Sequence, residues 1–163
     1  MTATLEAPPA PREALSDYEL ERGKPMPSKN HGLIQANLIV AMSMSDTYRP
    51  SSEMTLDIGI GHPVTPDISI IPRQPMELWN DEIRVTDPPV TAVEIVSPSQ
   101  TSSEMIKKVH AYLAHGLKTC WLVDPSLRQI IIYNADGTRK IFEEGLVTDP
   151  VTGITADMAA VFS

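Results

Sequence analysis

The chain has 163 residues, of which 42% are hydrophobic and 21% are charged, and its formal net charge is −8. This length allows one domain with one core, and no apolar run reaches the roughly 18 residues that a membrane-spanning helix needs. The single cysteine, Cys120, excludes an internal disulfide and a cysteine-based zinc cluster within one chain. Because the N-terminus also lacks the pattern of a secretory signal, we expect a cytoplasmic protein.

The first residues predict a tail that leads into one domain. Residues 1–12 are small and rich in proline, which is typical of a disordered N-terminal tail, and residues 13–163 predict a single domain. A short helix or a helix-to-strand entry is expected over residues 13–22, and the prolines within residues 24–29 end it.

A longer helix is predicted to begin at His31, with Asn30 as its N-cap, and to end near Tyr48. The following Arg49-Pro50 disfavours any continuation, since a residue before proline avoids the helical conformation. Apolar residues at helical spacing give this helix a core face, namely Ile34, Leu38, Ala41 and Met42.

Strands dominate the rest of the chain, and we expect them at residues 54–60, 67–71, 90–96, 119–123, 128–133 and 138–143. Apolar and polar residues alternate over 54–60, as in a half-buried strand. Residues 90–96 are nearly continuously apolar and β-branched, as in a strand buried on both faces. Residues 72–89 contain four prolines and predict a long irregular excursion.

One helix is predicted between two of these strands. Thr101 and Glu104 have the spacing of a capping box and Gly116 is a usual C-terminal stop, so the helix spans about residues 101–115. Another short helix is expected near residues 157–161. A strand–helix–strand crossover within an otherwise antiparallel run predicts an α+β (α/β) fold, with a mixed β-sheet flanked by helices.

Two acidic residues interrupt the predicted strands. Glu94 lies among valines and isoleucine, where a buried carboxylate needs a metal, a cation or a hydrogen-bond partner. Asp67 stands at the head of another strand, directly after Pro66. On neighbouring strands the two carboxylates could share one divalent cation through the oxygen ligands that Mg²⁺ prefers. The alternative is that they are solvated acids or turn caps at strand ends.

A lysine of the 101–115 helix bears on this choice. At about 100° per residue, one face of the helix is apolar and consists of Met105, Val109, Tyr112, Leu113 and Gly116. Lys107 points away from that face, whereas Lys108 lies at its border and can reach the sheet edge that holds Glu94. Its ammonium could orient or activate a water there, or stabilise phosphate charge. The alternative is an ion pair with Glu104 one helical turn away.

The motifs form an ordered set along the chain: Tyr18-Glu19-Leu20, Gly23, His31, Pro66-Asp67, Glu94 to Ser99, Lys108 four residues before Tyr112, Gly116, and Trp121 to Pro125. This set resembles the Uma2 (DUF820) family, which belongs to the PD-(D/E)XK nuclease superfamily, over roughly residues 15–135. The resemblance implies a restriction-endonuclease-like core and a metal-dependent endonuclease.

The resemblance also implies roles for single residues. Asp67 and Glu94 would bind the metal, and Glu19 would be the helix acid that assists metal or water binding. The superfamily usually has its lysine two residues after the second acid, where this chain has Val96, and the resemblance suggests that Lys108 takes its place. The implied cofactor is Mg²⁺ (or Mn²⁺), which would polarise the scissile phosphate and activate a water for in-line attack.

The implied substrate is nucleic acid, above all DNA, and a homodimer would supply two active sites for two strands. A second hypothesis is a catalytically inactive nuclease-fold domain that binds or acts as a scaffold. The acidic net charge favours it, since proteins bind nucleic acid mainly through Lys and Arg on phosphates, and so does the missing strand lysine.

Three further residues have open interpretations. His31 could contact substrate phosphate or pack near the start of its helix. Trp79 could stack on a base, although covering the core or contacting a second copy is favoured. Cys120, inside an apolar run, is interpreted as a buried and inert thiol.

Overall fold

The computed structural model describes residues 26–163. The predicted tail over residues 1–12, the predicted helix over 13–22 and Glu19 lie outside the described residues. The elements are, in chain order, α2 (Lys29–Met42), β1 (Tyr48–Ser52), β2 (Ile68–Pro72), β3 (Thr91–Ile95), α3 (Ser102–Ala114), β4 (Thr119–Asp124), β5 (Gln129–Asn134), β6 (Arg139–Phe142), β7 (Leu146–Thr148), β8 (Thr155–Asp157) and α4 (Met158–Val161). None of the described helices is long and apolar enough to cross a membrane.

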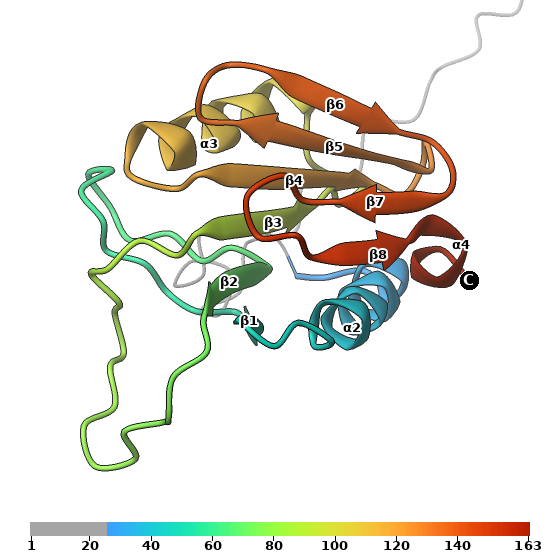
Figure 1. The fold of residues 1–163 in the computed structure, drawn as a ribbon. Coiled ribbons are helices and arrows are strands. Elements are labelled where there is room, and N and C mark those ends of the chain that lie inside the picture. Colours follow the sequence, from blue (N-terminus) through green and yellow to red (C-terminus); the bar gives the residue numbers. More distant parts are fainter. Residues whose placement is uncertain (1–25) are drawn as a thin grey trace, which may run out of the picture.

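Six strands form one mixed sheet in the order β1-β2-β3-β4-β5-β6 (Figure 1). Strands β3 and β4 are parallel and α3 connects them, whereas the other neighbouring pairs of this sheet are antiparallel. All five residues of β3 are buried, as its continuous apolar sequence predicted. The α+β fold class and the crossover are therefore confirmed.

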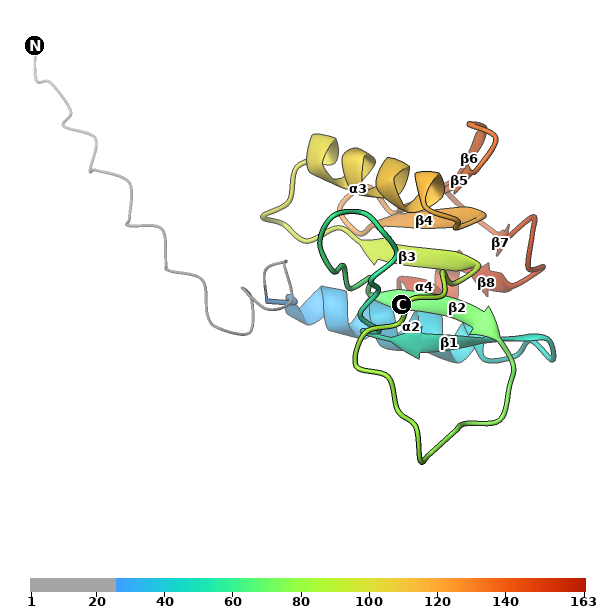
Figure 2. The same ribbon diagram turned by 90° about the vertical axis from the view of Figure 1, so that its left-hand side faces the viewer.

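The sheet has a core on each face, because side chains alternate along its strands. Helix α2 packs on one face together with α4 and the β7–β8 hairpin, over Val93, Ile95 and Trp121. Helix α3 packs on the other face, over Ala92 and Cys120. Figure 2 shows the two helices with the strands between them. Since Val93 and Ile95 face α2, the side chain of Glu94 faces α3.

Helix α2 begins and ends earlier than predicted. Its N-cap is Ser28 and not Asn30, because the Ser28 hydroxyl accepts a hydrogen bond from the backbone N–H of His31 at 3.2 Å. The helix ends at Met42, and Tyr48 is already the first residue of β1. The prediction took Pro50 as a sign of a preceding helix end, but this proline lies in an edge strand, where its missing N–H breaks no necessary ladder bond.

The strand predicted over residues 54–60 is wrong. Only Leu56 pairs there, through isolated bridges to Val64 and Val85. Leu56 is fully buried, and Ile58 and Ile60 pack partly buried against the core under α3. The alternating pattern thus comes from a loop that folds its apolar side chains onto the body.

Signals around α3 are confirmed. Thr101 and Glu104 make both hydrogen bonds of the capping box. Gly116 follows the helix with φ +105°, and a Cβ at this position would lie 2.9 Å from Cγ of Pro88, so both the backbone angle and the close approach require glycine.

Residues 73–89 form the predicted irregular excursion, which stands away from the sheet (Figure 1). Trp79 in this loop is fully exposed, so the interpretation that it covers the core is wrong. Base stacking and contact with a second copy stay predictions. Cys120 is fully buried, as expected, and the adjacent Trp121 is in the core.

Candidate active site

Asp67 lies directly before β2 and is only 1% exposed. Its Oδ2 accepts a hydrogen bond from the backbone N–H of Ile95 at 2.8 Å and lies 3.1 Å from Nε2 of His31. The register of β2 and β3 pairs Ile68 with Val93, so its continuation by one residue would set Asp67 opposite Glu94. The aspartate is thus fastened to the strand that carries the second acid.

Glu94 lies inside β3 and is also 1% exposed. Its Oε1 accepts a hydrogen bond from the hydroxyl of Tyr112 at 2.6 Å and lies 3.8 Å from Nζ of Lys108. Tyr112 and Lys108 are one helical turn apart on α3, so they reach the same carboxylate from one helix face. The charge within this apolar strand therefore has both a hydrogen-bond donor and a cation.

Helical geometry correctly separated the two neighbouring lysines. Lys107 is exposed, whereas the side chain of Lys108 is 24% exposed and directed to Glu94. The carboxylate of Glu104 accepts the backbone N–H of Thr101 in the capping box, which favours the contact with Glu94 over the alternative ion pair for Lys108. The ammonium of Lys108 therefore lies between a buried acid and the solvent.

The two buried acids affect the pKa of neighbouring groups. Burial raises the pKa of the Tyr112 phenol well above its ordinary value of 10.0, and the charges of Glu94 and, to a smaller extent, Asp67 raise it further. Burial also raises the pKa of the Cys120 thiol, with Glu94 adding to the effect and Lys108 opposing it. A buried thiol with a raised pKa is a poor nucleophile, which supports the interpretation of Cys120 as inert.

The two carboxylates offer the hard oxygen ligands that suit Mg²⁺ or Mn²⁺. Within residues 26–163, no group of three or more His, Cys, Asp or Glu side chains could hold a metal ion. A closed zinc site of protein ligands therefore does not fit the described part of the chain. A Mg²⁺ site does fit, because this ion is usually bound through one or two carboxylates and keeps several waters.

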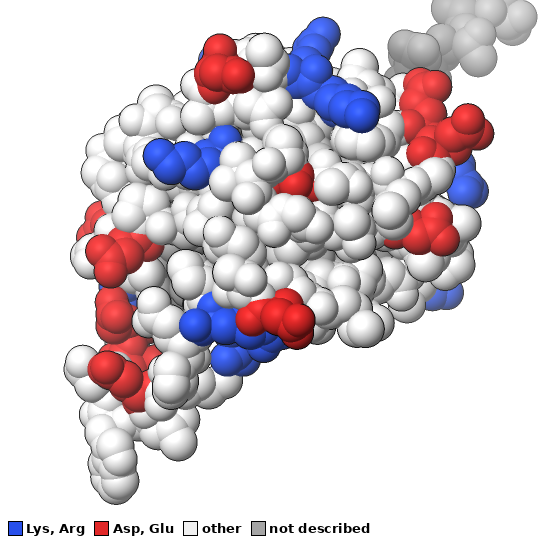
Figure 3. Space-filling view, viewed as in Figure 1, with Lys and Arg blue, Asp and Glu red and all other residues white. Residues whose placement is uncertain are grey.

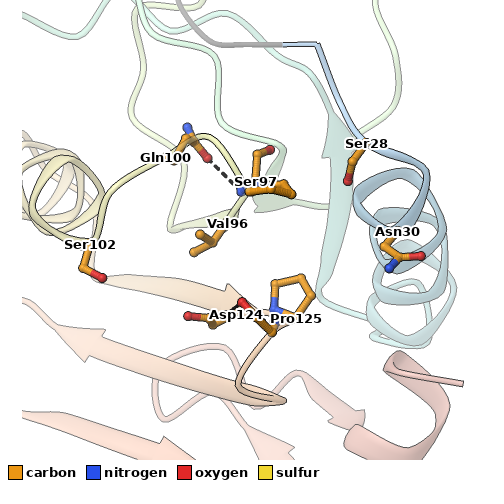
Figure 4. A pocket seen from close by; sticks show the side chains of 10 residues that line it. Ser28, Asn30, Val96, Ser97, Gln100, Ser102, Asp124 and Pro125 are labelled. Carbon is orange, nitrogen blue, oxygen red and sulfur yellow. Dashed lines mark hydrogen bonds between the residues drawn. The ribbon is translucent and has the colours of Figure 1, made fainter. Parts of the chain in front are cut away.

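A pocket of about 410 Å³ lies at the carboxyl ends of the parallel strands β3 and β4 (Figure 4). Its lining is mostly polar and includes Ser28, Asn30, Ser97, Gln100, Ser102 and Asp124. Neither acid lines it, but the loop that begins at Val96, two residues after Glu94, does, as does the first turn of α2, which carries His31. Helices α2 and α3 both begin at its walls.

Sequence reasoning missed three contributors to this region. Tyr112 was assigned to the core, and its hydroxyl was not considered. Nε2 of Gln35 donates to the backbone oxygen of Asp67 at 2.9 Å and to Oε1 of Glu53 at 3.3 Å. Gln35 follows His31 by one helical turn, a spacing that could have indicated a polar stripe on α2. Glu53 has φ +55°, an uncommon conformation for a residue other than glycine.

Lys and Arg side chains do not gather into one surface on the face drawn in Figure 3. There they lie in small groups interspersed with acids. The exposed loop over residues 73–89 adds four acids, namely Glu77, Asp81, Glu82 and Asp87. This face is therefore unsuited to tracking a phosphate backbone.

Comparison with known proteins adds two similarities. A model of the family Uma2, described as "Putative restriction endonuclease", matches residues 3–159. The chain is also similar to the crystal structure of "a putative nuclease belonging to DUF820" from Anabaena variabilis ATCC 29413, with a TM-score of 0.71 and 26% sequence identity over 85% of this chain and 83% of that chain. No curated protein matches it. The family resemblance drawn from the motifs and the restriction-endonuclease-like fold are thereby confirmed.

Proposed function

The chain belongs to the Uma2 family, and from this premise we propose that it is a metal-dependent endonuclease that hydrolyses phosphodiester bonds of DNA. Family and fold indicate a nuclease of the restriction-endonuclease-like type. The proposal adds Mg²⁺ or Mn²⁺ as the ion, DNA as the substrate, and Asp67, Glu94 and Lys108 as the residues that act, with Glu19 assisting.

One observation carries the proposal: two carboxylates, each 1% exposed, lie directly before β2 and inside the neighbouring strand β3, and an ammonium lies 3.8 Å from the second of them. Removing each charge from water costs several kcal/mol, which only close and well-oriented partners offset. A purely structural role would be served as well by apolar residues of similar volume. Such a cluster in a nuclease fold is therefore better explained by chemistry than by stability.

Each residue has a definable task in hydrolysis. Asp67 and Glu94 would hold the divalent cation, which when bound polarises a phosphate oxygen and lowers the pKa of a water. Lys108 would direct its ammonium at the attacking water or at the charge that develops on the phosphate. Tyr112 keeps the carboxylate of Glu94 in one orientation through its 2.6 Å hydrogen bond.

The pocket beside the acids is the proposed approach for the DNA backbone. Hydroxyl and amide side chains such as Ser97, Asn30 and Gln100 can donate to phosphate and sugar oxygens, which receive most protein–DNA hydrogen bonds. The first backbone N–H groups of helices also favour phosphate. Because the net charge of −8 opposes DNA binding, we expect binding to strengthen when a divalent cation is present.

Nicking of supercoiled plasmid tests the proposal. We expect nicking only with Mg²⁺ or Mn²⁺, none above background for Asp67→Asn, and a rate lowered about 10²- to 10³-fold for Lys108→Met, the usual effect of removing one charge-stabilising donor. Lys107→Met is the matched control, because this exposed lysine is adjacent in α3, and it should keep the wild-type rate.

Two results of these assays would contradict the proposal. If the wild-type protein neither nicks plasmid nor binds Mn²⁺, the second hypothesis of a catalytically inactive binding or scaffold domain takes its place. If Lys107→Met loses as much activity as Lys108→Met, the assigned role of Lys108 is wrong.

A homodimer is part of the proposal, because two active sites would cut both strands. The loop over residues 73–89 offers large exposed apolar side chains for such a contact, namely Met76, Leu78, Trp79 and Ile83. Light scattering after gel filtration should give twice the mass of the 17.9 kDa chain, and Trp79→Ser should shift it toward the monomer. A monomeric wild-type protein would refute this part.

A further inference from the structure

His31 contacts the candidate site from the opposite layer of the fold to α3. It is the third residue of α2, where the Ser28 cap holds its backbone N–H, and it is 3% exposed. Its Nε2 lies 3.1 Å from Oδ2 of Asp67. That oxygen also accepts the N–H of Ile95 at 2.8 Å, so two donors converge on one carboxylate oxygen.

The other ring nitrogen shows that this histidine is not explained by packing. Nδ1 of His31 is buried and has no hydrogen-bond partner in the part of the chain that the structure describes. A buried polar atom without a partner lowers stability, and an apolar side chain would fill the same space without that loss. What the imidazole supplies here, and an apolar side chain would not, is an N–H at Nε2 directed at Oδ2 of Asp67.

We propose that His31 is a positioning residue that orients the carboxylate of Asp67, an inference that rests on the nuclease function proposed above. The N–H of Ile95 and the imidazole fix Oδ2 from two directions, which stops rotation of the carboxylate. The direction of the second oxygen, Oδ1, is then set as well. His31 thus acts on the metal ligand, and not on substrate phosphate as one of the sequence interpretations had it.

Substitutions of His31 and a control in the same helix test this role. His31→Leu removes the donor with a side chain of similar reach, and His31→Gln returns an amide N–H. Leu38→Ala is the control, because this fully buried residue of α2 has an apolar side chain and its truncation destabilises the protein without removing a donor to Asp67. Thermal unfolding establishes that each variant is folded at the assay temperature.

Two readouts are needed, Mn²⁺ affinity by electron paramagnetic resonance and the separate kcat and KM for plasmid nicking. We expect His31→Leu to weaken Mn²⁺ binding or lower kcat about 10- to 100-fold, as removal of partners behind a metal ligand does, with KM for DNA nearly unchanged. His31→Gln should recover most of the loss. Leu38→Ala should keep the wild-type Mn²⁺ affinity despite a lower melting temperature.

The outcomes separate this role from the function on which it rests. If the wild-type protein binds Mn²⁺ and nicks DNA, and His31→Leu does both equally well, the positioning role is overturned while the nuclease stands. The same holds if His31→Gln is as impaired as His31→Leu, or if KM rises while kcat is unchanged. A wild-type protein that neither binds Mn²⁺ nor nicks DNA overturns the nuclease function and this role together.

Discussion

The hydroxyl of Tyr112 can be removed with little other disturbance. Tyr112→Phe keeps the fully buried ring and deletes the 2.6 Å hydrogen bond to Oε1 of Glu94, while Lys108 stays 3.8 Å from that oxygen. A hydrogen bond to a charged group contributes about 1.5–3 kcal/mol. Because Glu94 is 1% exposed, water does not replace the lost donor. We therefore expect the variant to be less stable at pH 7 by about 2 kcal/mol, within that range.

Alkaline pH should reduce this difference. The pKa of Tyr112 in the folded protein lies well above 10.0, raised first by burial and then by Glu94, whereas the unfolded phenol ionises near its ordinary value. Above pH 10 unfolding thus releases a proton, and rising pH favours the unfolded chain by about 1.4 kcal/mol per unit. The phenylalanine variant lacks this group, so the stability advantage of the wild type is full below pH 10 and shrinks above it.

Urea unfolding from pH 7 to pH 11 measures both effects. Trp121 is buried and Trp79 is already exposed, so a fluorescence change on unfolding reports mainly on Trp121. Contributions of the other tyrosines and of Cys120 cancel in the difference between the two proteins. If Tyr112→Phe matches the wild type at pH 7, or if the difference between them does not change above pH 10, the hydrogen bond and the raised pKa are not as described.

Three further substitutions test single contacts that stabilise the fold. Thr101→Ala removes the capping box of α3 and should lower the free energy of unfolding by about 1 kcal/mol in chemical denaturation; a loss below the error of the method would contradict the cap. Gly116→Ala places a side chain at φ +105° and 2.9 Å from Pro88, so calorimetry should show a melting temperature several degrees lower, about 1 kcal/mol or more. The buried N–H of Trp121 donates to Oδ2 of Asp149 at 2.8 Å. Asp149→Asn replaces one of the two accepting carboxylate oxygens with an NH2 group that cannot accept, and it should lower stability by about 3 kcal/mol. An unchanged urea midpoint would refute this contact.

Local patterns predicted those parts of the molecule that depend on nearby residues. The capping box at Thr101, the stop at Gly116 and the buried strand around Glu94 each follow from a few adjacent positions. Lys108 could be distinguished from Lys107 because the helical repeat alone fixes which of them borders the sheet. The proximity of Lys108 to Glu94 was predictable for that reason.

Contacts between segments far apart in the sequence could not be predicted from local patterns. The contact between His31 and Asp67 joins α2 to the start of β2, and no local pattern encodes such a pairing. The strand predicted around Leu56 was wrong because apolar and polar residues also alternate in a loop that packs its apolar side chains on the body. Strands β7 and β8, of three residues each, are too short for alternation to reveal them, and β1 contains Pro50, which disfavours a strand in most places.

The groups that contact the two buried acids come from two helices far apart in the sequence, so they are synthesised at different times. During translation Asp67 and Glu94 leave the ribosome before α3, which brings Lys108 and Tyr112. Until then the nascent strand lacks the cation and the hydroxyl that offset burial of Glu94, so this edge of the sheet stays hydrated. A half-synthesised chain therefore lacks the ammonium and the hydroxyl that contact Glu94, and the arrangement of the candidate site is complete only after α3 has been made.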